Sequence, residues 1–107
     1  MFHKNSNGGY KEVVEGVRLK TLVHGERTLL CNFRIEGGKT LPSHRHHHEQ
    51  TGYLVSGHMR FTIGGVEFDV EPGDSWCIPG DVEHAAEAYE DSMGVEVFSP
   101  VREEYLP

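Results

Sequence analysis

The chain has 107 residues, which suffices for one hydrophobic core and is too short for two ordinary domains. Seventeen Asp and Glu against ten Lys and Arg give a formal net charge of −7, which argues against a nucleic-acid partner. No apolar run reaches the ~20 residues of a membrane-spanning helix, and the amino terminus lacks the apolar segment of a secretory signal. We therefore expect a soluble, cytoplasmic protein with no membrane partner.

Apolar residues alternate with polar ones in several segments and nowhere keep a helical period beyond about two turns. Residues 1–16 are expected to form a flexible arm or an edge strand, and residues 17–107 the folded domain. The expected strands, separated by Gly, Pro and Asp, are 17–23, 28–36, 51–56, the two arms of 58–71, 74–79, 84–89 and 94–99. Short strands at close intervals predict an all-β sandwich or small barrel.

The hairpin over residues 58–71 is the clearest element. Apolar residues occupy alternate positions on both sides of Gly64-Gly65, a dipeptide suited to a tight turn. This turn places Phe61 opposite Phe68 on the apolar face. On the other face it pairs Arg60 with Asp69 and His58 with Glu71.

Four histidines fall within residues 44–48. On an extended strand His44, His46 and Gln50 would point to one side, and His84 follows a Pro-Gly turn that can return it toward them. Imidazole suits first-row divalent metals, so this set is a candidate metal site. The alternative is a polar surface patch, because clustering alone does not define a site.

Cys31 and Cys77 are far apart and form no CxxC arrangement, which argues against zinc-ribbon and thioredoxin-type chemistry. Both lie in expected strands, so buried, unreactive thiols are the expectation. A disulfide between them stays open at this point.

The histidine segments resemble the two motifs of the cupin family. The first motif, a Gly, five residues, His-x-His, three or four residues, Glu, six residues and Gly, matches residues 38–57 with Gln50 where Glu is usual. The second, a Gly, five residues, Pro-x-Gly, two residues and His, matches residues 73–84 with Asp81 in place of Gly. The resemblance implies a single-domain jelly-roll (double-stranded β-helix) cupin barrel over residues 17–107.

The same resemblance implies one divalent transition metal inside the barrel, and its ligands would be His44, His46, Gln50 and His84. These ligands would accept Zn, Ni, Fe, Mn or Co, so the metal's identity stays open. Because Gln50 is neutral, the site would keep the full charge of the ion, which favours Lewis-acid chemistry over oxygen activation.

The carboxy-terminal run is similar to small cupins of pectin and alginate breakdown, which linearise 4,5-unsaturated uronic acids to 5-keto-4-deoxyuronates. Their D-x-F-x-x-x-R arrangement falls here on Glu96, Phe98 and Arg102, with Glu in place of Asp. The resemblance implies that Glu96 is a catalytic acid/base and that Phe98 forms an aromatic substrate-binding wall. Arg102 would act in catalysis and bind the carboxylate of a small anionic sugar acid. A homodimer paired through the amino-terminal strands is also implied.

Several alternatives stay open on sequence alone. Strand parity allows Glu96 to face either solvent or the barrel lumen, and Arg102 can instead pair with Glu103 or Glu104. Trp76 can line a pocket or belong to the core. For function, the alternatives to the isomerase are an Fe(II)-dependent cupin dioxygenase and a non-catalytic cupin that binds a small ligand.

Overall fold

The structure is a computed structural model that describes residues 1–106. This part of the chain forms ten strands and one short 3-10 helix. In chain order they are β1 (Lys11–Val14), β2 (Val17–His24), β3 (Leu29–Ile35), β4 (Thr40–His44), β5 (Glu49–Ser56), β6 (Met59–Ile63), β7 (Val66–Val70), β8 (Ser75–Ile78), β9 (His84–Ala88), β10 (Ser92–Ser99) and η1 (Glu103–Tyr105).

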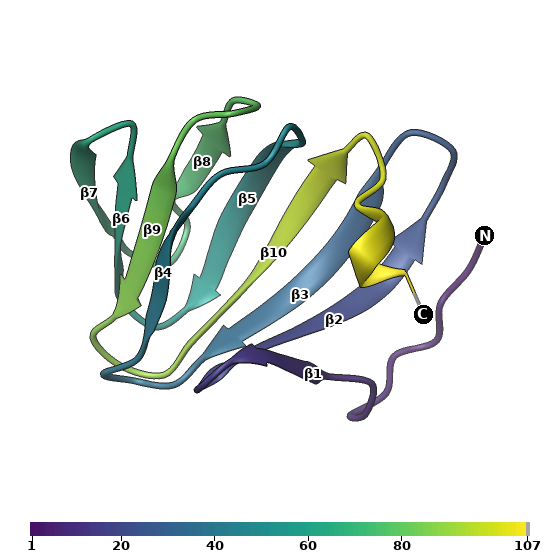
Figure 1. The fold of residues 1–107 in the computed structure, drawn as a ribbon. Helices are drawn as coiled ribbons and strands as arrows, with labels where there is room; N and C mark the ends of the chain where they lie inside the picture. The colour runs from purple at the N-terminus through teal and green to yellow at the C-terminus, as the bar shows by residue number, and fades with distance from the viewer. Residues whose placement is uncertain (107) are drawn as a thin grey trace.

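The strands form two antiparallel sheets (Figure 1). One sheet has six strands in the order β1-β2-β3-β10-β5-β8, and the other has four in the order β4-β9-β6-β7. β1 is the edge strand of the larger sheet, so part of the segment 1–16 pairs with the domain. The all-β jelly-roll prediction is confirmed. No helix in the described part of the chain has the length and apolar character needed to span a membrane.

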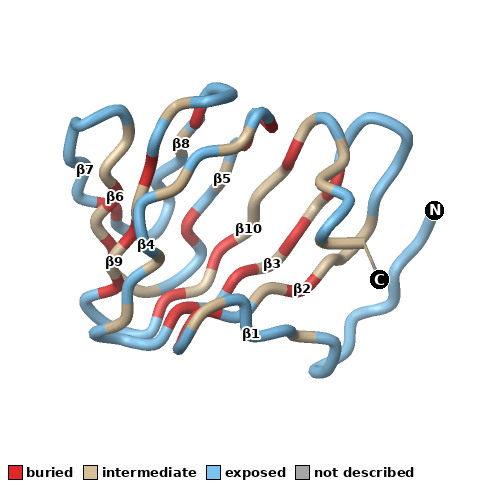
Figure 2. The backbone as a smooth tube through the Cα atoms, in the orientation of Figure 1, coloured by how far each residue is buried: buried red, intermediate tan, exposed pale blue. Residues whose placement is uncertain are grey.

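The core lies between the sheets, as the alternating pattern of the strands requires. In β3 the side chains of Leu29, Cys31, Phe33 and Ile35 are buried, and the residues between them are more exposed. Figure 2 shows buried stretches along the strands, whereas the loops and the amino-terminal arm are exposed. In β3, alternate residues therefore form the face that points into the core.

The β6–β7 hairpin has the predicted register, with Phe61 opposite Phe68 and the turn at residues 64–65. Its apolar face is only partly covered, because Val66 and Phe68 are exposed on the edge strand β7. The alternation in β7 therefore predicted the strand correctly and overstated its burial.

The charged pairs on the outer face of this hairpin differ from the prediction. His58 Nε2 lies 2.6 Å from Asp69 Oδ1. Asp69 is a diagonal neighbour of His58, whereas the sequence predicted the directly opposite Glu71 as its partner. Arg60 is opposite Asp69 in the ladder, but its guanidinium donates to Glu87 on β9 at 2.7 Å. Long side chains on a twisted sheet reach diagonal and next-strand partners as readily as direct ones.

The two cysteines have different environments. Both thiols are free. Cys31 is fully buried, and burial raises its pKa to about 12. Cys77 is exposed on the outer face of β8, so the expectation of a buried thiol was wrong for this residue.

The carboxy-terminal segment folds back onto the inner side of the larger sheet. Tyr105 and Leu106 pack against a buried cluster that includes Phe98, and the Thr21 hydroxyl donates a hydrogen bond to the Tyr105 carbonyl. This packing brings η1 over the strand that precedes it, so that residues after β10 help to line the barrel cavity.

Candidate active site

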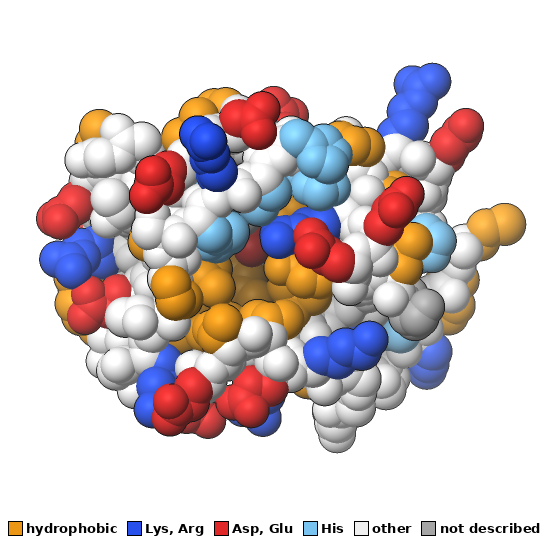
Figure 3. All heavy atoms as spheres, viewed as in Figure 1, with side chains coloured by type: hydrophobic (Ala, Val, Ile, Leu, Met, Phe, Trp, Pro, Cys, Tyr) orange, Lys and Arg blue, Asp and Glu red, His pale blue; other side chains and the backbone are white. Residues whose placement is uncertain are grey.

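A cavity opens between the two sheets. Figure 3 shows a hollow with a largely hydrophobic lining, histidines on one rim and charged side chains beside them. Its polar lining consists of His44, Gln50, His84, Glu96 and Arg102. The cavity therefore contains most of the residues that the two motif resemblances had singled out.

Three histidines come together at this cavity. His44 ends β4, His84 begins β9 directly opposite it in the ladder, and His46 lies in the loop between β4 and β5. Their candidate ligand nitrogens all lie within 4.8 Å of one another. The extended segment assumed from sequence is interrupted after His44, so the side chains converge because a loop crosses between the sheets. Parity along one strand does not bring them together.

Each of these rings is oriented through its Nδ1 atom. The contacts are His44 Nδ1 with the Pro42 carbonyl at 2.9 Å, His46 Nδ1 with the His48 carbonyl at 3.0 Å, and His84 Nδ1 with the Val82 carbonyl at 2.9 Å. A carbonyl accepts only, so Nδ1 carries the proton and Nε2 keeps its lone pair. This is the tautomer that can bind a metal through Nε2, with a backbone partner fixing the ring.

The free nitrogens of two rings are buried without a protein partner. His46 Nε2 and His84 Nε2 are both buried and lack a hydrogen bond. Burial lowers the pKa of His46 to about 4, with smaller contributions from the positive charge of Arg102 and from His84. Burial also lowers the pKa of His84. Both rings are therefore neutral at neutral pH, and their unpaired Nε2 atoms fit a bound cation.

Gln50 lines the same cavity as His44 and His84. Its Nε2 donates to Glu96 Oε2 at 2.5 Å, while its Oε1 is buried without a partner. The amide N–H is the donor in this bond, so the bond fixes the orientation of the amide and leaves Oε1 available. Imidazole nitrogens and an amide oxygen are donors that suit a first-row divalent metal.

Glu96 faces the lumen, a question that strand parity had left open. Residues 94 and 98 share its side of β10 and are both buried. Its Oε2 also accepts a hydrogen bond from Trp76 Nε1 at 3.0 Å. Burial raises the pKa of the Glu96 carboxyl, and the bonds from Trp76 and Gln50 oppose that rise.

Arg102 lies at the rim of the same cavity, with a side chain only 11% exposed. Its guanidinium lies over the rings of Tyr105, at 4.3 Å from the centroid, and Phe98, at 5.3 Å. Its Nε donates to Glu104 Oε1 at 2.5 Å. Arg102 therefore lines the cavity and also pairs with Glu104, one of the two acidic partners considered from the sequence. Phe98 is buried beneath it.

Two contacts at the site could not be predicted from the sequence. Trp76 stands between core and pocket, because it packs on Phe61 and also donates to Glu96. The turn at Gly80-Asp81 braces the histidine loop, since the Asp81 amide donates to the His46 carbonyl at 2.7 Å. Asp81 adopts a left-handed φ of 65°, which explains the motif's preference for Gly there. The departure from the motif was the only available signal.

Comparison with known proteins gives matches that cover the whole fold. The structure of KdgF from Halomonas sp. superposes with a TM-score of 0.92 and is 29% identical, covering 99% of this chain and 98% of that one. An RmlC-like cupin from Shewanella frigidimarina superposes with a TM-score of 0.91 at 24% identity, covering 98% and 95%, which supports the fold alone.

At the level of sequence, the chain is 34% identical over 76 residues to an H2HPP isomerase from Bacillus subtilis. That match covers 69% of this chain and 32% of the isomerase, so the match spans about a third of that relative's length. Residues 32–99 match the cupin domain, and this segment contains the histidines, Gln50, Glu96 and Phe98. The chain belongs to the cupin family.

Proposed function

We propose that this cupin is a metal-dependent enzyme that converts 4,5-unsaturated uronic acid monosaccharides to linear 5-keto-4-deoxyuronates. The observation that carries this proposal is that Glu96 and Arg102 line the same cavity as His44 and His84, two of the three clustered histidines. An acid/base carboxylate and a cation for the substrate carboxylate are the two groups that this reaction needs beyond a Lewis acid.

The relatives support this assignment over its alternatives. The match to KdgF extends over nearly the full length of both chains. The Bacillus relative is named as an isomerase. The name isomerase fits chemistry without a redox change.

The residues that would hold the metal are His44, His46, Gln50 and His84. A divalent ion bound there would act as a Lewis acid toward substrate oxygens. A neutral donor set leaves the charge of that ion undiminished, and Zn, Ni, Fe, Mn and Co all suit it.

In the proposed reaction, one proton leaves an oxygen of the substrate and one is added to a carbon. The anomeric hydroxyl of the substrate loses its proton, the bond between C1 and the ring oxygen breaks, and C4 gains a proton as the enol becomes a ketone. Substrate and product are isomers, so no oxidant or reductant is consumed. Glu96 is the group suited to carry the proton, because Oε2 is occupied by Gln50 and Trp76 and Oε1 is left for the substrate. Arg102 holds the substrate carboxylate at the rim.

The test is to incubate the purified, metal-loaded protein with a freshly prepared unsaturated uronate and follow the loss of ultraviolet absorbance of its conjugated double bond. We expect a rate well above that of buffer. Glu96→Gln and Arg102→Ala should each abolish the activity while the bound metal, measured by elemental analysis, stays at the wild-type level.

Two outcomes would contradict the proposal. The first is an unaccelerated reaction with metal confirmed in the protein. The second is consumption of oxygen that requires Fe(II), which would instead indicate the cupin dioxygenase.

A further inference from the structure

The charge of Arg102 is already engaged inside the chain. Its Nε donates to Glu104 Oε1 at 2.5 Å, in the segment that follows β10. This hydrogen bond lowers the pKa of the Glu104 carboxyl, which is therefore ionised at neutral pH. Arg102, at the rim of the cavity, is thus already paired with a carboxylate of the same chain.

Glu104 is not needed to orient the guanidinium. Arg102 lies over the ring of Tyr105 and near that of Phe98, and both rings are anchored, Phe98 by burial in β10 and Tyr105 by its packing on the inner cluster. Stacking of a guanidinium on aromatic faces holds its plane without an acidic partner.

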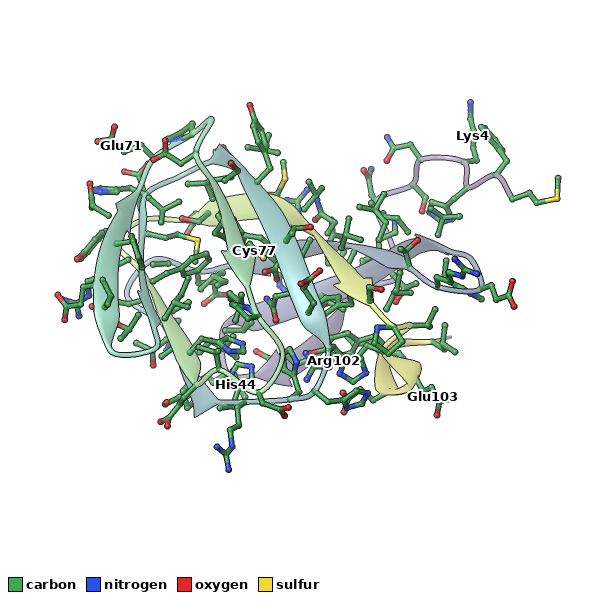
Figure 4. All side chains as sticks on the ribbon, turned by 90° about the horizontal axis from the view of Figure 1, so that it is seen from above. Lys4, His44, Glu71, Cys77, Arg102 and Glu103 are labelled. Atoms are coloured by element: carbon green, nitrogen blue, oxygen red, sulfur yellow. The ribbon has the colours of Figure 1, made fainter. Side chains whose placement is uncertain are left out.

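The two partners also differ in their access to water. The Arg102 side chain is 11% exposed, whereas that of Glu104 is 59% exposed. Glu104 can therefore move into solvent without losing a buried environment, while Arg102 stays at the cavity. Figure 4 shows Arg102 at the same end of the barrel as His44, with Glu103 at the outside of η1.

We propose that Glu104 is an internal competitor for the substrate carboxylate and sets the affinity of this site for anionic ligands. In the free protein it occupies Arg102, and an incoming carboxylate takes its place while Glu104 turns to solvent. This inference rests on the proposed function only in requiring that the ligand is a carboxylate. It assigns to the Arg102–Glu104 pair a role in selectivity, because a ligand without a carboxylate offers Arg102 no replacement for Glu104.

The size of the effect follows from the exposure of the pair. An ion pair with a mostly exposed carboxylate is weak, so its loss should tighten the binding of a competing carboxylate by about two- to five-fold. Glu104 should therefore weaken the binding of carboxylates at this site without preventing it.

The experiment is isothermal titration of the metal-loaded full chain with D-galacturonate, a saturated uronate that cannot turn over. Glu104→Gln is compared with Glu103→Gln, which removes the same charge one residue earlier from an exposed side chain. We expect tighter binding in Glu104→Gln by about two- to five-fold and unchanged binding in Glu103→Gln. In the background of Arg102→Gln, the further change Glu104→Gln should have no effect.

Equal tightening in both single variants would overturn the proposal, because it would reflect net charge. Weaker binding, or no binding, in Glu104→Gln would overturn it as well, since Glu104 would then support the site. The result is independent of catalysis: a wild-type protein that leaves the unsaturated uronate unchanged contradicts the proposed function, while the galacturonate titrations still decide the role of Glu104.

Discussion

The amide of Gln50 and the carboxylate of Glu96 are joined by a hydrogen bond of 2.5 Å across neighbouring strands. This contact explains why a glutamine stands where cupins commonly carry a glutamate. A carboxylate at position 50 would lie against the carboxylate of Glu96, and two like charges at that distance cannot both be ionised without cost.

Gln50→Glu should therefore lower the unfolding free energy, measured in a chelator at neutral pH, by about 1–3 kcal/mol. The exchange Gln50→Glu with Glu96→Gln restores one donor and one acceptor, so it should recover most of that loss. It should not recover activity, because the acid/base carboxylate has moved to the ligand position. Chemical denaturation measures the first effect and the uronate assay the second. Equal stability of the single and double variants would contradict this explanation.

A small residue at position 52 keeps Trp76 in place beside Glu96. A Cβ at Gly52 would lie 2.3 Å from the Trp76 ring, so Gly52→Ala must displace the indole that donates to Glu96. We expect a loss of stability of about 1–3 kcal/mol from overpacking, together with reduced activity.

Trp76 is the single tryptophan of the chain, so intrinsic fluorescence reports its position directly. Gly52→Ala should shift the emission spectrum. Gly25→Ala is the matched control, because its Cβ would meet nothing within 4 Å. An unchanged spectrum in Gly52→Ala would show that the indole had not moved.

The Gly80-Asp81 turn should control metal affinity without supplying a ligand. A Cβ at Gly80 would lie 2.5 Å from the His47 carbonyl oxygen, so Gly80→Ala pushes on the loop that carries His46. We expect metal affinity to fall by about ten-fold or more, as for other changes that disturb ligand orientation. A competition titration with a chromophoric chelator measures it.

Asp81→Gly is the control within the same turn. It relieves the left-handed backbone conformation and keeps the amide that donates to the His46 carbonyl. Metal affinity should stay unchanged, and stability should stay the same or rise slightly. Loss of affinity in this variant would assign a ligand-positioning role to the Asp81 carboxylate and not to the backbone of the turn.

The two thiols should differ sharply in reactivity. The thiolate is the reactive form, and a pKa raised to about 12 leaves almost no thiolate at Cys31 at pH 8. Exposed Cys77 should therefore react with a disulfide reagent at pH 8, and Cys31 only after unfolding. Counting thiols before and after adding guanidinium tests this, with Cys77→Ser expected to abolish the first phase. Two fast-reacting thiols in the native protein would contradict the burial of Cys31.

Sequence reasoning succeeded where local chemistry determines the outcome. The Gly64-Gly65 turn and the alternation around it were enough to give the β6–β7 register. Strand β4 is absent from the expected strands, because Pro42 interrupts the alternation there, although an edge strand tolerates proline. The alternation in β7 overstated the burial of Phe68, since coverage of an edge strand depends on the partner sheet.

For the candidate site, the motif spacing identified the cavity residues, but not the contacts that join them. The face of Glu96 was ambiguous because β10 has apolar residues on both sides, and only the packing of the larger sheet shows which side is inner. The bond from Trp76 to Glu96 joins residues twenty positions apart, on strands that both flank β5, and no local pattern encodes it.

The proposed ligands belong to different layers of the sandwich. His44 and His84 stand on strands of the smaller sheet, and Gln50 stands on the larger one. The described residues contain no disulfide. An ion bound at this point would therefore be the one link between the two sheets that is stronger than a hydrogen bond or a packing contact. The survival of the folded chain against proteases and heat would then follow the supply of that ion.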